Sequence, residues 1–256
     1  MSMHLSFLRR TEVGFAVFKV LDVKLGARTS IVHITLSQQD REEVVAYVTN
    51  TNLINETGPS FPTSFSLDPP PPKVELSMLE SGQDSQWGEP PKLPFIKFRK
   101  AVQNVHFFFP RVGQTSASTL DQWITLASGE AFTDTSLGFV VDMFPQIIEN
   151  HRFHGKDPYA VDLANRPSEE DMKKSATGPF WYPTVLLNLE VKKALPDKGS
   201  KWLFVRIGVK MIRNGRYDIE VLVFDETGDL VAISNHVALI MEAARNLSKR
   251  TDKGKL

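Results

Sequence analysis

The stretch 136-SLGFVVDMFPQIIEN-150 decides the fold, because it predicts the one long helix of the chain. Its apolar side chains recur at intervals of three and four residues, which is the spacing of one buried helical face. Hydroxyl and carboxyl groups at 133–135 can cap its first turn. Pro145 lacks the amide hydrogen that a helix interior needs, so we expect a bend there. The apolar face consists of Leu137, Val140, Val141, Phe144, Ile147 and Ile148.

Strand-forming segments lie on both sides of this helix. Upstream, the aromatic run 105–109 predicts a strand, and residues 122–126 either extend it or approach the helix. Downstream, Asn-Gly at 214–215 and Thr-Gly-Asp at 227–229 are hairpin signals. This order predicts a complete α+β domain over residues 95–245, in which a curved antiparallel sheet surrounds one helix. The four downstream strands are expected at 184–191, 202–212, 217–224 and 230–240.

The residues before this domain divide into a strand-rich part and a proline-rich part. Nine of the sixteen prolines fall between Pro59 and Pro94, and such a segment is unsuited to a central strand or a helix interior. We therefore expect an extended, semi-rigid linker over 59–94. Residues 246–256 are charged and predict a flexible tail. Within residues 1–58, short β-branched or aromatic runs predict strands at 15–20, 30–36 and 44–48.

A weak internal repeat relates the two strand-rich parts. Gly-Ala-Arg at 26–28 and Asn-Gly-Arg at 214–216 each precede a strand, and residues 45–54 resemble 231–240 in order and spacing. One such unit leaves a sheet edge and an open face, which a second unit can cover. The repeat predicts a pseudo-dimer whose first unit is incomplete and lacks its helix. We expect the protein to form a homo-oligomer or to expose apolar sheet surface.

Composition narrows the classes of partner and chemistry. Thirty basic and thirty acidic residues cancel, which does not favour nucleic acid or an anionic membrane as a partner. The chain has no cysteine, so disulfides, thiolate nucleophiles and cysteine-ligated metals are excluded. No secretory h-region follows Met1, and no run of eighteen apolar residues occurs. We expect a cytoplasmic protein; the terminal Lys-Leu is only a partial match to a peroxisomal address.

Three motifs give the chain a family resemblance. They are FLRRTEVG at 7–14, WYPT at 181–184, and Gly215-Arg216 followed by SNHVAL at 234–239. In this order the chain resembles the double hot-dog proteins of the acyl-CoA thioesterase II-like superfamily, in their fungal thioesterase-like branch. The resemblance implies hydrolysis of an acyl-CoA or carrier-bound acyl thioester, in fungal lipid or polyketide (secondary) metabolism. It also implies a strand and a helix before the first motif, so we expect a truncated N-terminus.

The same resemblance implies three catalytic positions, an Asp on the helix, a Thr or Ser on the next strand and a Gln near the last strand. Matched motif by motif, they are Asp142, Thr184 and, in place of the Gln, His236. Neutral imidazole has one donor and one acceptor, so His236 either keeps the hydrogen-bonding role or marks a changed or lost reaction. In this chemistry Asp142 is the base for water, and Thr184 and His236 orient the water. No metal and no cofactor is required.

Each of these residues also has a plainer interpretation. Asp142 lies far from the apolar stripe on a helical wheel, as a solvated residue does. Thr184 is expected on the strand face of Leu186 and Asn188, as an ordinary strand threonine. A lone strand histidine such as His236 is more often structural than catalytic. A non-hydrolytic acyl-binding or dehydratase-like hot-dog protein therefore stays open beside the thioesterase, because a fold does not determine a function.

Overall fold

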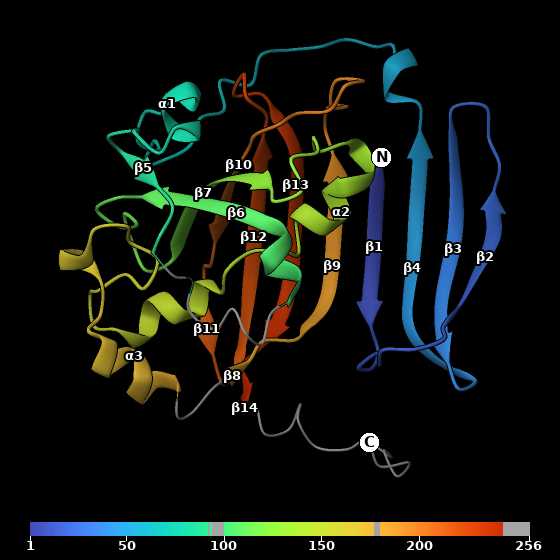
Figure 1. Ribbon diagram of the computed structural model, residues 1–256. Coiled ribbons are helices and arrows are strands. Elements are labelled where there is room, and N and C mark those ends of the chain that lie inside the picture. Colours follow the sequence, from blue (N-terminus) through green and yellow to red (C-terminus); the bar gives the residue numbers. More distant parts are fainter. Residues whose placement is uncertain (92, 94–99, 177–179, 243–256) are drawn as a thin grey trace.

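One antiparallel sheet dominates the computed structural model, which describes residues 1–91, 93, 100–176 and 180–242 (Figure 1). The tail expected at 246–256 lies outside these residues. The sheet has the order β2-β3-β4-β1-β9-β13-β12-β10-β7-β6-β5, with β11 beside β12. Its first strands are β1 (Ser2–Phe7), β2 (Val17–Lys24), β3 (Thr29–Gln38), β4 (Arg41–Thr51), β5 (Trp87–Gly88), β6 (Val105–Pro110) and β7 (Thr119–Leu126). The later ones are β9 (Thr184–Val191), β10 (Leu203–Gly208), β11 (Ile212–Arg213), β12 (Arg216–Phe224) and β13 (Leu230–Leu239).

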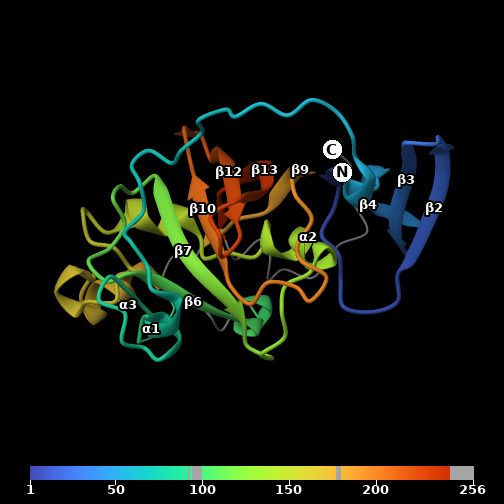
Figure 2. The same cartoon turned by 90° about the horizontal axis from the view of Figure 1, so that it is seen from above.

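Short helical segments pack beside the C-terminal strands. None among the described residues is long and apolar enough to cross a membrane. Figure 2 shows that α1, α2 and α3 lie away from β2 and β3. The segments are η1 (Leu53–Asn55), α1 (Leu76–Glu80), η3 (Lys100–Asn104), η4 (Asp134–Ser136), α2 (Leu137–Val140), η5 (Ile147–Arg152), η6 (Leu163–Asn165) and α3 (Glu169–Ala176). A separate two-stranded pair joins β8 (Phe180–Trp181) to β14 (Met241–Glu242).

The strand order is symmetric about the boundary between β1 and β9. Outward from that boundary, β1, β4, β3 and β2 lie on one side, and β9, β13, β12 and β10 lie on the other. In each series the first strand along the chain is innermost and pairs with the last, so that β1, β2, β3 and β4 correspond to β9, β10, β12 and β13. This arrangement agrees with the internal repeat seen in the sequence, in which β3–β4 corresponds to β12–β13. Residues 1–58 hold four strands and the single turn η1.

The predicted helix 136–150 does not run without interruption. α2 ends at Val140, the residues around Pro145 are not helical, and η5 starts only at Ile147. Proline cannot donate to the carbonyl four residues earlier, and its ring disfavours the helical conformation of the preceding residue. The expectation of one bent helix is therefore wrong. The expected apolar residues are nevertheless all buried in the main core, against the inner face of the sheet.

The predicted linker is packed in its second half. α1 and β5 both lie within 59–94, and Leu79 and Trp87 have no exposed surface. The indole Nε1 of Trp87 donates to the main-chain oxygens of Pro72 and Lys73 at 3.2 Å each. These side chains build a second apolar cluster with Phe204 and its neighbours on the outer side of the sheet. An unpacked linker is therefore the wrong description from α1 onward, because apolar residues follow the proline run.

Strand prediction was accurate at the hairpins and failed at the N-terminus. Asn214 and Gly215 both have positive φ, at 52° and 72°, as a two-residue hairpin between β11 and β12 requires. The strand expected at 202–212 is divided into β10 and β11. β1 was not predicted, although Met3, Leu5 and Phe7 alternate with polar residues and lie between the two halves of the sheet. That alternation was the signal for it.

Candidate active site

The structure brings Asp142, Thr184 and His236 together. Asp142 lies in the turn after α2, Thr184 begins β9, and His236 lies in β13, which pairs with β9. The Thr184 hydroxyl donates to Oδ1 of Asp142 at 3.2 Å, and the same oxygen lies 3.7 Å from Nδ1 of His236. Three side chains that are remote in sequence thus meet at one spot. Their catalytic roles stay a prediction.

Asp142 reaches this spot because the helix ends before it. Its backbone amide still bonds to the carbonyl of Phe139 at 3.3 Å, and the chain then leaves the helical path toward Pro145. A helical wheel therefore misplaces Asp142, because its side chain belongs to a turn. The side chain is 42% exposed, so the carboxylate is open to solvent on one side and contacts Thr184 on the other.

Thr184 reaches the same spot through a β-bulge. At its first residues β9 has one residue more than β13, because Val185 is skipped in the register between them. Such an insertion reverses the alternation of faces along the strand. Thr184 therefore points to the inner side of the sheet, as His236 does. The expectation that Thr184 shares a face with Leu186 and Asn188 is wrong for this reason.

His236 is enclosed between the sheet and the segment after α2. Its side chain has no exposed surface, and the ring of Phe144 lies 6.1 Å away between centroids. Its Nε2 lies 2.9 Å from the hydroxyl of Ser234, which donates to the main-chain oxygen of Asn188 at 2.7 Å. Burial lowers the pKa of His236 to about 4, because the imidazolium would lose its hydration. The ring is therefore neutral at pH 7.

A buried carboxylate near the site was not predicted. The side chain of Glu149, in η5, is 3% exposed; it accepts from the Tyr182 hydroxyl at 2.5 Å and from the Arg152 guanidinium at 3.0 Å. Burial, and then the charge of Glu149, raise the pKa of Tyr182 far above its usual range. The phenol therefore stays a donor. Tyr182 stands two residues before Thr184 in the WYPT motif, and this tyrosine was the available signal.

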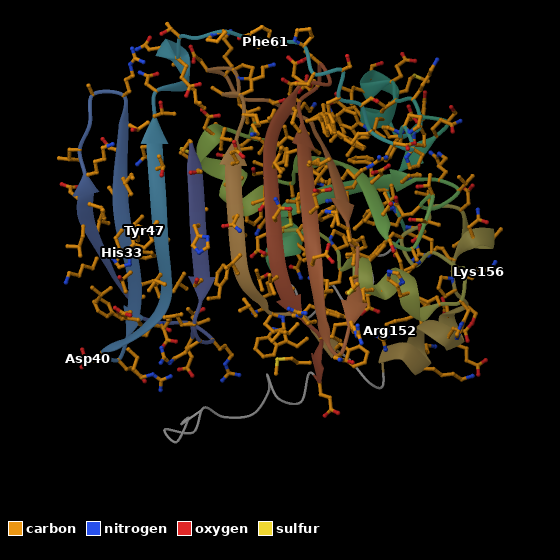
Figure 3. All side chains as sticks on the ribbon, turned by 180° about the vertical axis from the view of Figure 1, so that it is seen from behind. His33, Asp40, Tyr47, Phe61, Arg152 and Lys156 are labelled. Atoms are coloured by element: carbon orange, nitrogen blue, oxygen red, sulfur yellow. The ribbon has the colours of Figure 1, made fainter. Side chains whose placement is uncertain are left out.

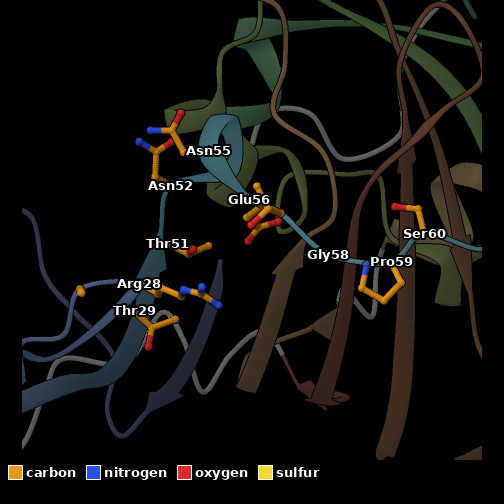
Figure 4. A pocket seen from close by; sticks show the side chains of 11 residues that line it. Arg28, Thr29, Thr51, Asn52, Asn55, Glu56, Gly58, Pro59 and Ser60 are labelled. Carbon is orange, nitrogen blue, oxygen red and sulfur yellow. The ribbon is translucent and has the colours of Figure 1, made fainter.

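Other polar features do not join these three residues. No group of three His, Asp or Glu side chains that could hold a metal ion occurs in the described part of the chain. A polar pocket opens where β3 begins and β4 ends, beside the loop that follows η1 (Figure 4). Arg28 and Glu56 contribute its charged groups. None of the three predicted site residues lines it.

Two related family models together match most of the chain. The family model described as the acyl-CoA thioesterase N-terminal domain matches residues 1–51, and the C-terminal domain model of the same proteins matches residues 73–240. The thioesterase-like protein TwmA of Talaromyces wortmannii is 36% identical over 280 residues, covering 98% of this chain and 79% of TwmA.

Two solved structures show the fold. A conserved protein of unknown function with a hot-dog fold from Alicyclobacillus acidocaldarius has a TM-score of 0.63 and 15% identity, covering 93% of this chain and 77% of that protein. The acyl-CoA thioesterase II TesB2 from Mycobacterium marinum has a TM-score of 0.56 and 14% identity, covering 94% and 80%. At these identities the likeness concerns the hot-dog fold alone.

Proposed function

The chain belongs to the acyl-CoA thioesterase family, and we propose that it hydrolyses an acyl thioester of coenzyme A or of an acyl carrier with an activated water. The family membership supports the reaction class. The observation that carries the proposal is the meeting of Asp142, Thr184 and His236 at one half-exposed spot. Thioester hydrolysis needs a group that accepts a proton from water close to the carbonyl carbon that the water attacks. The carboxylate of Asp142 and the imidazole of His236 are two such proton acceptors at one spot.

In the proposed reaction, water loses a proton to a side chain of this site while its oxygen attacks the thioester carbonyl. The tetrahedral intermediate then expels the thiolate, which takes up a proton and leaves as the free thiol. Thr184 donates to Asp142 and so fixes the carboxylate relative to the strand. The family supports an acyl-CoA substrate, and we further propose a place in fungal lipid or polyketide metabolism; the relative TwmA comes from the fungus Talaromyces wortmannii.

The test is release of free thiol from a panel of acyl-CoAs of different chain length. Asp142→Asn should lower kcat by on the order of 10²-fold or more, because the amide keeps the shape and removes the negative charge. Asp162→Asn is the matched control, since Asp162 lies on the surface and its side chain makes no capping hydrogen bond. Equal rates in wild type and Asp142→Asn would remove Asp142 from the mechanism.

One observation favours a second candidate, a non-hydrolytic dehydratase-like or acyl-binding hot-dog protein. His236 stands where the family pattern has Gln, and a histidine facing a carboxylate is also suited to elimination of water from a 3-hydroxyacyl thioester. The imidazole would take the α-proton, and the acid form of Asp142 would protonate the departing hydroxyl. Formation of a conjugated enoyl thioester from 3-hydroxyacyl-CoA, without thiol release from any acyl-CoA, would decide for this candidate.

We also propose a homo-oligomer that covers the apolar side chains around β2. All eight residues of β2 are exposed, and Phe15 and Phe18 are 89% and 67% exposed. On the face of the sheet opposite to Phe18, the rings of His33 in β3 and Tyr47 in β4 stack, with centroids 4.8 Å apart (Figure 3). Sedimentation of wild type should show an oligomer that Phe18→Lys weakens, while Val112→Lys, at an exposed apolar residue away from β2, leaves it intact. A wild-type monomer that binds no hydrophobic dye would contradict this proposal.

A further inference from the structure

The side chain of Ser234 stands between a main-chain carbonyl and the ring of His236. Its hydroxyl lies 2.7 Å from the carbonyl oxygen of Asn188 and 2.9 Å from Nε2 of His236. A carbonyl oxygen can only accept, so the single hydrogen of the hydroxyl is used on Asn188. Toward the ring, Ser234 has only lone pairs to offer. Nε2 of His236 must therefore carry a hydrogen and donate it to Ser234.

This contact fixes the tautomer of the neutral ring. When Nε2 carries the hydrogen of a neutral imidazole, Nδ1 has a free lone pair. Nδ1 is buried and has no hydrogen-bond partner within the described part of the protein. It points toward Asp142, the charged group that faces the ring; β9 contributes the carbonyl of Asn188 and β13 contributes Ser234. The lone pair of His236 is thus directed at the candidate site.

Two acceptors face each other at this spot. Nδ1 of His236 and Oδ1 of Asp142 are 3.7 Å apart, which is too long for a hydrogen bond between them. The hydroxyl of Thr184 already donates to Oδ1 of Asp142. A water molecule has two hydrogens, and it can donate one to the lone pair of Nδ1 and the other to the carboxylate. Nδ1 has no accessible surface as the side chains stand, so such a water enters when the exposed side chain of Asp142 shifts away from the ring.

We propose that Ser234 is a positioning residue that holds His236 as its Nε2–H tautomer, so that Nδ1 is the general base for the attacking water. This inference rests on the proposed thioesterase function and deepens it, because it moves the base from the carboxylate to the imidazole. Nδ1 takes a proton as the water oxygen bonds to the thioester carbon, and the C–S bond then breaks. The thiolate takes that proton back from Nδ1, and Asp142 stabilises the imidazolium in between.

The role differs from that of a glutamine at the same position. A carboxamide is too weak a base to accept a proton from water, so it can only orient the water by hydrogen bonding. The exchange of one side chain for the other therefore separates the two roles. If Asp142 is the base, His236→Gln restores the family pattern and keeps the rate. If His236 is the base, the same substitution removes the proton acceptor.

The first measurement is the protonation of the ring nitrogens by NMR of protein labelled with ¹⁵N-histidine. His236→Gln identifies the signals of His236 among those of the six histidines, because they vanish in that variant. We expect the neutral Nε2–H form in wild type. Ser234→Ala should lose this preference, and kcat for acyl-CoA hydrolysis should fall at least about tenfold with little change in KM. The control Ser200→Ala also removes a buried serine hydroxyl and should leave both tautomer and kcat unchanged.

The second measurement is the rate of His236→Gln, which should fall on the order of 10²-fold or more. An Nδ1–H ring in wild type would overturn the inference, and this result does not depend on whether Ser234→Ala folds. A His236→Gln enzyme as fast as wild type would also overturn it, and would leave the base role to Asp142. An Nε2–H ring in a protein that hydrolyses no acyl-CoA would overturn the proposed function and the base role together, while the effect of Ser234 on the tautomer would stand.

Discussion

The buried contact between Tyr182 and Glu149 offers the sharpest test of the packing beside the candidate site. Tyr182→Phe removes only the hydroxyl that donates to the carboxylate at 2.5 Å. The ring keeps its place, edge-to-face with Tyr217 at 6.5 Å between centroids, so no cavity forms. Glu149 then keeps Arg152 as a partner but loses its phenol donor.

The expected cost follows from the charge and burial of the acceptor. A hydrogen bond to a charged group contributes about 1.5–3 kcal/mol, and the side chain of Glu149 is 3% exposed, so water replaces the lost donor poorly. We expect the free energy of unfolding to fall by about 2 kcal/mol. The matched control is Tyr217→Phe, whose hydroxyl donates to the neutral Oε1 of Gln146 at 3.2 Å and should cost about 1 kcal/mol or less.

Equilibrium unfolding in urea measures both variants. At an m-value of about 3 kcal/mol/M, the midpoint of Tyr182→Phe should fall by about 0.7 M, and that of Tyr217→Phe by about half of this or less. Unchanged m-values would show that the unfolded states are comparable. Equal midpoint shifts in the two variants would refute the reasoning, because the charge of Glu149 would then add nothing to the bond.

Three further outcomes follow from buried groups elsewhere in the structure. The folded-state pKa of His236, about 4, lies below its unfolded value of about 6.5, so stability should fall by up to about 3 kcal/mol between pH 6.5 and 4. The negative charge of nearby Asp142 favours the imidazolium and so reduces this loss. His236→Gln should flatten the dependence of stability on pH, and identical profiles in wild type and variant would contradict the prediction. Trp87→Ala should lower the free energy of unfolding by about 3–5 kcal/mol, as measured by thermal unfolding, because Trp87 is fully buried. If residues 59–94 were an unpacked linker, the same substitution would change the stability very little. Arg206→Met should lower the free energy of unfolding by about 3–5 kcal/mol, because it leaves the buried carboxylate of Asp121 without its ion-pair partner. Adding Asp121→Leu should restore most of this stability, and chemical unfolding of the single and double variants measures the recovery.

The sequence predicted those parts of the fold that depend on local patterns. Alternating residues and the Asn214-Gly215 turn located the C-terminal hairpins, and the apolar run at 137–148 correctly indicated the core. The length of the helix was overestimated because the cost of Pro145 was treated as a bend, whereas in the structure the helical hydrogen bonds stop. β1 was missed because a six-residue alternation at a terminus is a weak signal until its two neighbours are known.

The candidate site was predictable as a set of residues but not as a geometry. The motifs indicated Asp142, Thr184 and His236, and the structure brings them together. The sequence could not predict which nitrogen of the His236 ring carries the hydrogen. That depends on the carbonyl of Asn188, which approaches Ser234 only because β9 and β13 pair. Contacts between strands that are 46 residues apart leave no local pattern in a single sequence.

Because of the bulge at Val185, the position of Thr184 depends on the number of residues at the start of β9 more than on which residue stands at position 185. Val185 is 38% exposed, so many side chains would be tolerated there without disturbing the core. Loss of that one residue, by contrast, would restore regular pairing and turn the threonine hydroxyl to the outside of the sheet. Relatives should therefore vary freely in the identity of this residue while conserving the number of residues around it, and a deletion there would remove Thr184 from the candidate site without unfolding the protein.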